Sequence, residues 1–313
     1  MGVDISVVIV NWNTKNLLMD CLSSVFETIK GISFEVWVVD NGSADDSVAA
    51  TRKKFPQASV IENGRNLGFA AANNRAFDCM NGRYALLLNT DAVLTEGAVS
   101  ELYCFMEKTP EAAMACGQLL NSDGSKQNSF ANFPTLAALL ANETLLRIFF
   151  PDKFPSKRRQ YKEPIEIESC VGACMIVRKE AMDKVGIFDE DYFFFFEETD
   201  WAYRMKRAGW KVFFVPSSLI YHLQGKSAGS NASARIMFYR SRYIYFSKWR
   251  PESSTTLHII VFFRLLVNVI LNMAGTVVTF GLNKHIRTRS SLYTQLLVWH
   301  LSGCPDNIEV SSK

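Results

Sequence analysis

The chain has 313 residues, of which 48% are hydrophobic and 21% are charged. These proportions predict one large folded domain or two closely associated ones, and they exclude a chain that is disordered throughout. The formal net charge of +3 is too small to indicate a nucleic-acid-binding protein. The seven cysteines are scattered and odd in number, which predicts buried thiols in a reducing compartment rather than a disulfide framework. Because an apolar strand pattern starts at Ile5, we expect no signal peptide and a cytoplasmic location.

Short apolar segments alternate with helical patterns in the N-terminal half of the chain. Residues 5–10, 34–39, 58–61 and 84–88 predict buried strands, and apolar residues recur at helical spacing in 17–26. This order is typical of an α/β fold in which a mixed, mainly parallel sheet carries helices on both faces. We therefore expect a Rossmann-like nucleotide-binding architecture.

Each of these strands is followed by a polar residue that could reach a ligand. These residues are Asn11, Asp40, Asn66 and Asp91. Ligands of open α/β sheets bind at the carboxyl ends of the strands, so the four side chains predict a ligand cleft there. Asp91 alone could hold a divalent metal or cap the next helix. The chain lacks the glycine-rich motifs of dinucleotide-binding and P-loop proteins, and the chemistry would suit a nucleotide: Asp40 at the ribose or base, Arg65 near the phosphates and Asp91 at a metal.

The second half of the chain has fewer regular patterns. We expect a short strand at 114–117, a helix at 97–108, a helix at 136–150, strands at 169–177, 211–216 and 219–222, and a turn at 121–125. The basic cluster of 153–164, which contains Lys157, Arg158, Arg159 and Lys162, is either a solvated loop or a contact with an anionic partner.

Five aromatic residues precede three carboxylates in the segment 192–201. An apolar wall would desolvate these acids and raise a pKa, which is what a general base needs; a helix that begins with favourable acids is the simpler alternative, and both can hold together.

The strand tips resemble those of family 2 glycosyltransferases of the GT-A fold, most of all the bacterial branch that contains rhamnosyltransferases. The motifs that carry the likeness are Val10-Asn11-Trp12-Asn13, Val39-Asp40-Asn41-Gly42-Ser43, Asn66-Leu67-Gly68-Phe69 and Asn89-Thr90-Asp91. The resemblance implies that Val10, Asn11, Asp40, Arg65, Asn66, Gly68, Asn89 and Asp91 bind a nucleotide sugar. It also implies that Asp91 binds Mg²⁺ or Mn²⁺, in a D-x-D-like motif whose first position is Asn89 here.

A second group of motifs extends the resemblance to about residue 250. These motifs are Gly172-Ala173, Gly186-x-Phe188-Asp189 and Phe196-Glu197-Glu198-Thr199-Asp200. They imply that Glu198 or Asp200 is the catalytic base, with Glu198 favoured, and that Gly172, Ala173, Phe196 and Trp201 lie on the acceptor side. His222 falls where similar enzymes place a histidine near the metal, and Lys226, Ser227 and Arg235 would belong to a lid over the phosphates.

The segment 257–282 is almost entirely apolar and long enough to cross a bilayer. Arg264, Asn268 and Asn272 form one polar stripe, and Lys284, His285, Arg287 and Arg289 follow the segment. Three interpretations stay open: a helix in the membrane interface, a packing or dimer helix, and a true span.

We therefore expect a catalytic domain at 1–250, with a nucleotide-sugar half at about 1–120 and an acceptor half at about 121–250, and a membrane-associated helical region at 251–313. The predicted enzyme is an inverting, metal-dependent glycosyltransferase that moves a sugar, with rhamnose as one candidate, to a cell-surface glycan or a polyprenyl-linked acceptor. It would sit on the cytoplasmic face of the bacterial inner membrane, with homodimer formation left open. The alternatives are a nucleotidyltransferase that makes a sugar nucleotide and a non-catalytic membrane-surface binding protein.

Overall fold

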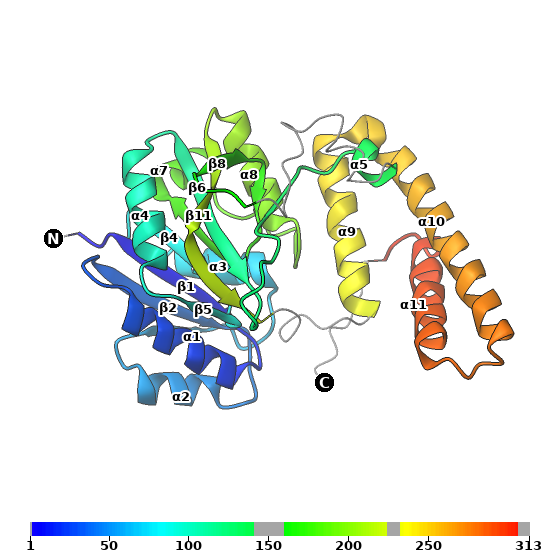
Figure 1. Ribbon diagram of the computed structural model, residues 1–313, viewed down its shortest axis with the longest axis horizontal. Coiled ribbons are helices and arrows are strands. Elements are labelled where there is room, and N and C mark those ends of the chain that lie inside the picture. Colours follow the sequence, from blue (N-terminus) through cyan, green and yellow to red (C-terminus); the bar gives the residue numbers. More distant parts are fainter. Residues whose placement is uncertain (1, 141–159, 224–231, 306–313) are drawn as a thin grey trace. The chain divides into compact units, whose positions relative to one another are not determined.

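The computed structural model describes residues 2–140, 160–223 and 232–305. The chain clusters into two compact units, Met1–Phe193 with Glu197–Ser227 and Phe194–Phe196 with Ala228–Lys313 (Figure 1). In this division α9 (Ala232–Trp249) belongs to the second unit. The physical reason is that α9 packs on the helices that follow it; the Tyr243 ring, for example, stacks on His258 at a centroid distance of 3.9 Å.

The first unit is built on a nine-stranded sheet with the order β3-β2-β1-β4-β10-β6-β11-β5, and β8 pairs with β11. Its strands are β1 (Ile5–Asn11), β2 (Phe34–Asp40), β3 (Ser59–Glu62), β4 (Tyr84–Leu88), β5 (Ala92–Leu94), β6 (Ala112–Leu120), β8 (Ile165–Ile167), β10 (Cys174–Arg178) and β11 (Lys211–His222). Strands β1 to β4 pair in parallel, as predicted, and β10 joins them antiparallel to β4. A separate two-stranded sheet pairs β7 (Phe130–Ala131) with β9 (Ser169–Cys170).

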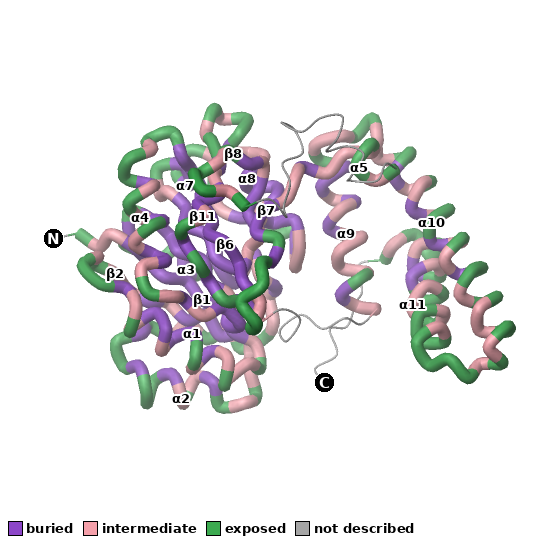
Figure 2. The backbone as a smooth tube through the Cα atoms, in the orientation of Figure 1, coloured by how far each residue is buried: buried purple, intermediate pink, exposed green. Residues whose placement is uncertain are grey.

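Helices cover both faces of the sheet because the strand side chains alternate between two cores. Val7 and Leu86 belong to one core cluster, with residues of α1 (Lys15–Thr28) and α4 (Ala98–Lys108). Val8 and Leu87 belong to the other cluster, with residues of α3 (Phe69–Phe77), α7 (Lys179–Val185) and α8 (Glu197–Arg207). The described part of this unit also contains α2 (Ser47–Lys54) and the short α5 (Leu136–Leu140). Figure 2 shows the buried positions concentrated in the strands. The prediction of an α/β sheet covered on both faces is confirmed.

Some expected elements differ in detail. The strand expected at 169–177 is divided into β9 and β10, because the chain leaves the ladder between them to pass the tip of β4, where the Asn89 amide donates to Ala173 O at 2.9 Å. The two strands expected at 211–216 and 219–222 are one strand, β11, with a register shift between Val215 and Leu219. Most of the helix expected at 136–150, the basic residues Lys157, Arg158 and Arg159, and Lys226 and Ser227 of the expected lid lie outside the described residues.

The second unit contains α9, α10 (Pro251–Val278) and α11 (Lys284–Leu301). One narrow face of α10 is buried, at Leu257, Val261, Leu265 and Val269. This spacing of four residues places the seam on a single side of the helix. Among the described residues, α10 is the one helix long and apolar enough to cross a membrane, by length and composition alone.

Candidate active site

The tips of β1 and β2 lie side by side because the two strands are in register. Asn11 pairs with Asp40 along the ladder, and its amide nitrogen donates to Asp40 Oδ1 at 2.9 Å. The other carboxylate oxygen of Asp40 accepts hydrogen bonds from the backbone amides of Gly42 and Ser43 at 3.1 and 2.8 Å. Asp40 therefore closes its own turn, and Asn11, which is fully buried, connects that turn to β1. Val10, beside this connection, is half-buried.

The loop before α3 is held against the same edge of the sheet. The side-chain oxygen of Asn66 accepts a hydrogen bond from the Gly68 amide at 2.9 Å. Gly68 has a φ of +85°, and a Cβ placed there would lie 2.4 Å from the carbonyl oxygen of Phe193, so glycine is required at this position. The Phe69 amide donates to the same carbonyl at 2.7 Å. Arg65 remains exposed on this loop, where its guanidinium can approach an anion.

The tip of β4 joins these two tips through hydroxyl groups. Thr14 donates to Asn11 Oδ1 at 2.8 Å, and the Thr14 and Thr90 hydroxyls lie 3.0 Å apart. Asp91 is 1% exposed, and Asn89 is half-buried beside it. The expectation that these strand tips gather at one edge of the sheet is confirmed by the parallel register of β1, β2, β3 and β4.

Asp91 is brought to His222 by the pairing of β5 with β11, in which His222 lies opposite Ala92. His222 Nε2 is 3.4 Å from Asp91 Oδ1. On the other side of the ring, Nδ1 is 3.0 Å from the side-chain oxygen of Gln127. The nitrogen of that same amide is directed at three oxygen acceptors, which are Leu120 O, Asn121 Oδ1 and His222 O.

This arrangement determines which imidazole nitrogen is free. The two N–H groups of the Gln127 amide point toward these three acceptors, so the amide oxygen must accept a hydrogen bond from Nδ1–H of His222. A neutral His222 then carries its lone pair on Nε2. That lone pair and the Asp91 oxygen face each other, which is favourable when a cation lies between them. Two ligand atoms about 2.1 Å from one ion lie about 3.0 to 3.4 Å apart at angles of about 90° to 109°. The separation of His222 Nε2 and Asp91 Oδ1 therefore fits a divalent metal ion.

Glu197 and Glu198 form a buried acidic pair at the start of α8. Burial raises the pKa of Glu198 to about 7, and it raises the pKa of Glu197 well above its usual value with a contribution from the negative charge of Glu198. The Oε2 atoms of both residues have no hydrogen-bond partner among the described residues. Backbone amides of Glu198 and Thr199 act in the opposite direction, but burial is the larger effect. A carboxylate with a pKa near neutrality and one oxygen without a hydrogen-bond partner is suited to accept a proton.

Asp200, the other candidate base, already forms an ion pair with Arg204. It is fully buried and accepts a hydrogen bond from Arg204 Nε at 2.8 Å within an ion pair. Arg204 in turn donates to the carbonyl oxygens of Val185 and Ile187 at 2.7 Å each. This network secures the turn before α8, so the geometry favours Glu198 over Asp200 as the base.

Two residues expected on the acceptor side are core residues in the structure. Trp201 is fully buried, its ring contacts Phe188 at a centroid distance of 4.5 Å, and its indole nitrogen donates to Gly186 O. Phe196 is 8% exposed and packs in the second unit. Neither side chain is available to a bound acceptor, because each is surrounded by its own core. By contrast, Gly172 has open space at its Cβ position, next to the buried Ala173.

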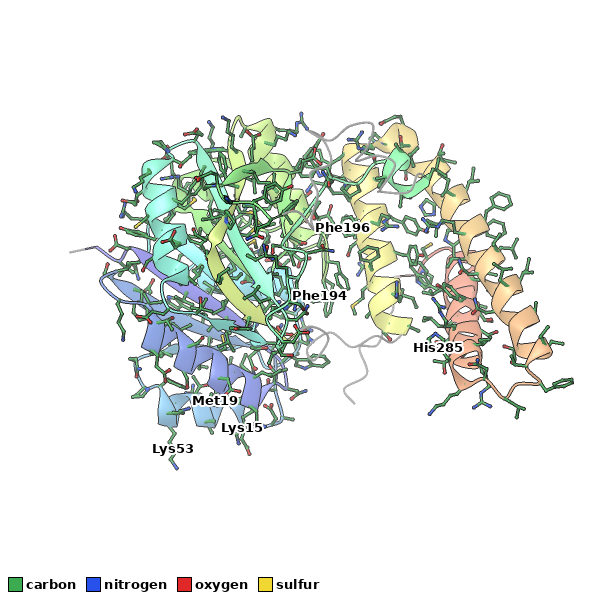
Figure 3. The ribbon with its side chains drawn as sticks, viewed as in Figure 1. Lys15, Met19, Lys53, Phe194, Phe196 and His285 are labelled. Carbon is green, nitrogen blue, oxygen red and sulfur yellow. The ribbon has the colours of Figure 1, made fainter. Side chains whose placement is uncertain are left out.

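The segment before the acidic pair has an unusual backbone. Phe195 and Phe196 have φ angles of +71° and +70°, a conformation that costs bulky residues about 1 to 3 kcal/mol each and persists only where the surroundings enforce it. Helix α9 provides this constraint. Ser241 donates to the Phe194 carbonyl at 2.9 Å, and Phe238 contacts the rings of Phe195 and Phe196 at 5.6 and 5.3 Å. Figure 3 labels Phe194 and Phe196, and Glu197 and Glu198 follow them directly in the chain.

Sequence reasoning missed Gln127, Ser241 and Phe238. Gln127 and His222 are 95 positions apart, and nothing in the local pattern of either residue connects them. Ser241 and Phe238 occur in an ordinary helical pattern. The left-handed phenylalanines that they hold could be recognised only from the backbone.

Comparison with known proteins identifies the family of the chain. A family profile described as Glycosyl transferase family 2 matches residues 6–186. An N-acetylglucosaminyl-diphospho-decaprenol L-rhamnosyltransferase of Mycobacterium tuberculosis is 27% identical over 243 residues, which cover 71% of this chain and 79% of that protein. A low-salt glycan biosynthesis hexosyltransferase, Agl10 of Haloferax volcanii, is 25% identical over 209 residues, which cover 65% of this chain and 62% of that protein.

Solved structures share the fold at low sequence identity. The mannosyltransferase PcManGT from Pyrobaculum calidifontis, in complex with GDP-Man and Mn²⁺, has a TM-score of 0.57 at 15% identity, over 96% of this chain and 88% of that one. GalNAc-T7 with UDP, GalNAc and Mn²⁺ has the same TM-score at 19% identity, over 81% of this chain and about half (51%) of that one. These structures have the GT-A fold.

Proposed function

Because the chain belongs to glycosyl transferase family 2, we propose that it transfers a sugar from a nucleoside diphosphate sugar to a hydroxyl group, with inversion at the anomeric carbon. The observation that carries the mechanism is the buried carboxylate of Glu198, whose pKa is raised to about 7. A glycosyltransferase needs such a base, whereas a nucleotidyltransferase does not have to deprotonate a sugar hydroxyl at an acceptor site of this kind.

The reaction is a single displacement. Glu198 takes the proton of the acceptor hydroxyl while that oxygen forms a bond to the anomeric carbon. The bond from this carbon to the diphosphate oxygen breaks on the opposite face, and its electron pair leaves with the nucleoside diphosphate. Asn11 and Asp40 would support the strand tips that contact the nucleotide. Arg65 is exposed on the same loop as Asn66 and Gly68, from which its guanidinium would bind the phosphates.

Asp91 and His222 would hold Mg²⁺ or Mn²⁺. When bound there, the ion would neutralise charge on the departing diphosphate. Gln127 keeps the imidazole in the tautomer that presents Nε2 to the site. Asn89 of the same motif is uncharged, so the proposed metal ligands are one carboxylate and one imidazole.

The support for an acceptor class comes from the rhamnosyltransferase relative, whose name specifies a sugar diphosphate on decaprenol. By analogy we propose a polyprenyl-linked glycan as acceptor and L-rhamnose as one candidate for the transferred sugar. Such an acceptor keeps its lipid in a membrane, which the second unit is suited to contact. Gly172, which has open space at its Cβ position, is our proposed acceptor-facing residue.

Helix α10 is the proposed membrane-binding element. Opposite its buried seam, Ile259, Phe263, Val267, Ile270, Leu271, Val277 and Val278 are all more than half exposed. Asn268, Asn272 and Thr276 each donate to the carbonyl four residues earlier, at 2.7 to 2.8 Å, which satisfies these polar groups within the helix itself. The basic N-terminus of α11 follows, where Figure 3 labels His285.

We propose that α10 lies in the interface and does not span the bilayer. The reason is that α11 runs back alongside α10 (Figure 1), and it begins with Lys284, His285, Arg287 and Arg289, all exposed. A spanning α10 would draw α11 back into the hydrocarbon together with exposed polar residues such as Gln295, and it would leave these charges at the far surface of the bilayer, away from the cytoplasmic headgroups. An interfacial helix instead places them beside anionic headgroups on the cytoplasmic face.

The test of the transfer function uses full-length protein, a panel of dTDP-, UDP- and GDP-sugars, and polyprenyl-linked acceptors. We expect release of nucleoside diphosphate, and not pyrophosphate, together with a glycosylated lipid of inverted anomeric configuration. The variant Glu198→Gln should lower the transfer rate by about 10²-fold or more and leave donor binding intact. The matched control Glu180→Gln, at an exposed position of α7, should retain activity. Transfer by Glu198→Gln at the wild-type rate would overturn the assignment of the base.

A further inference from the structure

Two imidazoles and a thiol converge in the second unit, among residues that the proposed transfer reaction does not use. They are His258 of α10, His300 of α11 and Cys304 just beyond α11. One potential ligand atom from each lies within 4.8 Å of the other two, and all three residues are half-buried. The family profile matches the chain only up to residue 186, so this cluster lies outside the matched part.

The thiol reaches the imidazole because the chain turns back sharply after α11. Gly303 and Cys304 both have left-handed backbones, with φ angles of +84° and +57°. The Gly303 amide donates to His300 O, and the Cys304 amide donates to Trp299 O. The indole nitrogen of Trp299 then donates to Pro305 O at 3.2 Å, which secures the turn from the other side.

This turn brings Cys304 Sγ to 3.7 Å from His300 Nδ1. A left-handed conformation is unfavourable for a residue with a Cβ, by about 1 kcal/mol or more, and such strain is found where a side chain must be aimed at a target. In an extended continuation of the chain, the thiol would move away from the helix. The turn therefore pre-positions the thiol next to the imidazole.

Aromatic contacts hold the second imidazole in place. The ring of His258 stacks on Tyr243 at a centroid distance of 3.9 Å, and the two histidine rings are 5.7 Å apart. The Tyr243 hydroxyl is 3.0 Å from His300 Nδ1. A fourth, oxygen-containing group thus lies at the same place, where it can hydrogen-bond a ligand or complete a coordination sphere.

The ligand types and distances match one class of ion. Zinc is held by imidazole nitrogen at about 2.0 to 2.1 Å and by thiolate sulfur at about 2.3 Å, and in a tetrahedron two such ligands are about 3.5 Å apart. His300 Nδ1 and Cys304 Sγ are already close to this spacing, at 3.7 Å. The ligand atoms of the cluster that are farthest apart, within 4.8 Å of each other, would have to approach by about 1 Å, which side-chain rotation can supply. Hard cations such as Mg²⁺ prefer oxygen ligands and do not suit this set.

We propose that His258, His300 and Cys304 form a structural site for a thiophilic divalent cation of the zinc class, which fastens the end of α11 to α10. The site is separate from the proposed metal position at Asp91 and His222, because no residue is shared. Its role is to stabilise the helical unit, since an ion that binds the folded chain and not the unfolded one raises the free energy of unfolding.

The test uses full-length protein freed of metal by a chelator and then titrated with Co²⁺ as a spectroscopic probe and with Zn²⁺ in competition. The background variant Asp91→Asn removes the carboxylate of the proposed donor site, so that binding in the second unit is measured alone. We expect one equivalent of Co²⁺ to produce a thiolate-to-cobalt charge-transfer absorption that Zn²⁺ abolishes. Cys304→Ser should remove this absorption, and His258→Gln or His300→Gln should weaken binding by about 10- to 100-fold.

The control is Cys79→Ser, which changes an exposed cysteine of the first unit and should leave the absorption unchanged. Zinc should also protect Cys304, and not Cys79, from alkylation in the protein with both cysteines present, a readout that needs no folded variant. A titration without thiolate absorption, or equal alkylation of Cys304 with and without Zn²⁺, would overturn the site. Neither result would affect the proposed transfer reaction, whose activity is measured with Mg²⁺ or Mn²⁺.

Discussion

At the scale of single residues, the raised pKa of Glu198 makes a prediction about pH. The base works when it is deprotonated, so kcat/KM for transfer should fall as pH decreases through about 7, by about tenfold for each pH unit below the midpoint. Rates measured between about pH 5.5 and 9, beside donor affinities from calorimetry over the same range, separate a catalytic effect from a binding effect. A flat rate profile across neutrality would contradict the role of Glu198.

The same raised pKa predicts that Glu198→Gln stabilises the protein. A carboxyl group with a higher pKa in the folded state than in the unfolded state favours folding less as pH rises from about 4.5 to 7. Removing its charge should therefore raise the free energy of unfolding at pH 8, by about 2 to 3 kcal/mol. Denaturant titrations at pH 8 measure this change. A variant that is both inactive and more stable has lost a catalytic group and not its fold, whereas a less stable variant would contradict this argument.

Gln127 contacts His222, the proposed metal ligand, and should control the orientation of its ring. Gln127→Ala removes the acceptor of Nδ1–H, which frees the His222 ring to rotate or change tautomer, and we expect Mn²⁺ affinity to fall by about 10- to 100-fold. Calorimetry with Mn²⁺ and a nucleoside diphosphate measures this affinity. The control is Gln295→Ala, at an exposed position of α11. Gln127→Glu keeps an acceptor and should restore most of the affinity. If it binds as weakly as the alanine variant, Gln127 supports the local fold and not the tautomer.

At the scale of elements, α9 maintains the strained backbone that leads into α8. Ser241→Ala removes the hydroxyl that donates to the Phe194 carbonyl, and Phe195 and Phe196 then lose part of the constraint on their left-handed conformation. We expect kcat to fall by about five- to tenfold, the equivalent of one hydrogen bond, with donor KM unchanged because the nucleotide-binding strand tips are separate elements. Steady-state kinetics measure both constants. The control is Ser291→Ala on α11, and an equal change in kcat and KM would contradict a positioning role.

The elements differ in how far the sequence could predict them. Strands β1, β2 and β4 are short apolar runs with polar ends, so both their type and the gathering of Asn11, Asp40 and Asp91 follow from local pattern. The Trp201 side chain, in contrast, was expected on the acceptor side from the family resemblance, while the structure places its ring in the core with residues of α3, α7 and α8. Burial of one helical face depends on tertiary contacts that a local pattern does not contain.

At the scale of the whole molecule, each part of the site depends on pairs that are distant in sequence. His222 meets Asp91 only because β11 pairs with β5, and the chain order gives no sign of that antiparallel pairing. The sequence of α9 likewise gives no sign that this helix packs on α10 and α11. The gathering of the strand-tip residues was thus predictable, and the contacts that hold them in place were not.

The proposed attachment to the membrane would be a property of the entire chain and can be tested as such. We expect full-length protein to sediment with vesicles that contain anionic phosphatidylglycerol and to bind neutral phosphatidylcholine vesicles more weakly, because apolar burial and headgroup attraction act together. Substituting Phe263, Ile270 and Val277 of the exposed face with glutamine should abolish binding to both vesicle types. Lys284→Glu with Arg287→Glu should reduce binding to the anionic vesicles, whereas Lys53→Glu on α2 (Figure 3) should not. Unchanged sedimentation of the glutamine variant would show that the exposed face of α10 meets another protein surface instead of lipid.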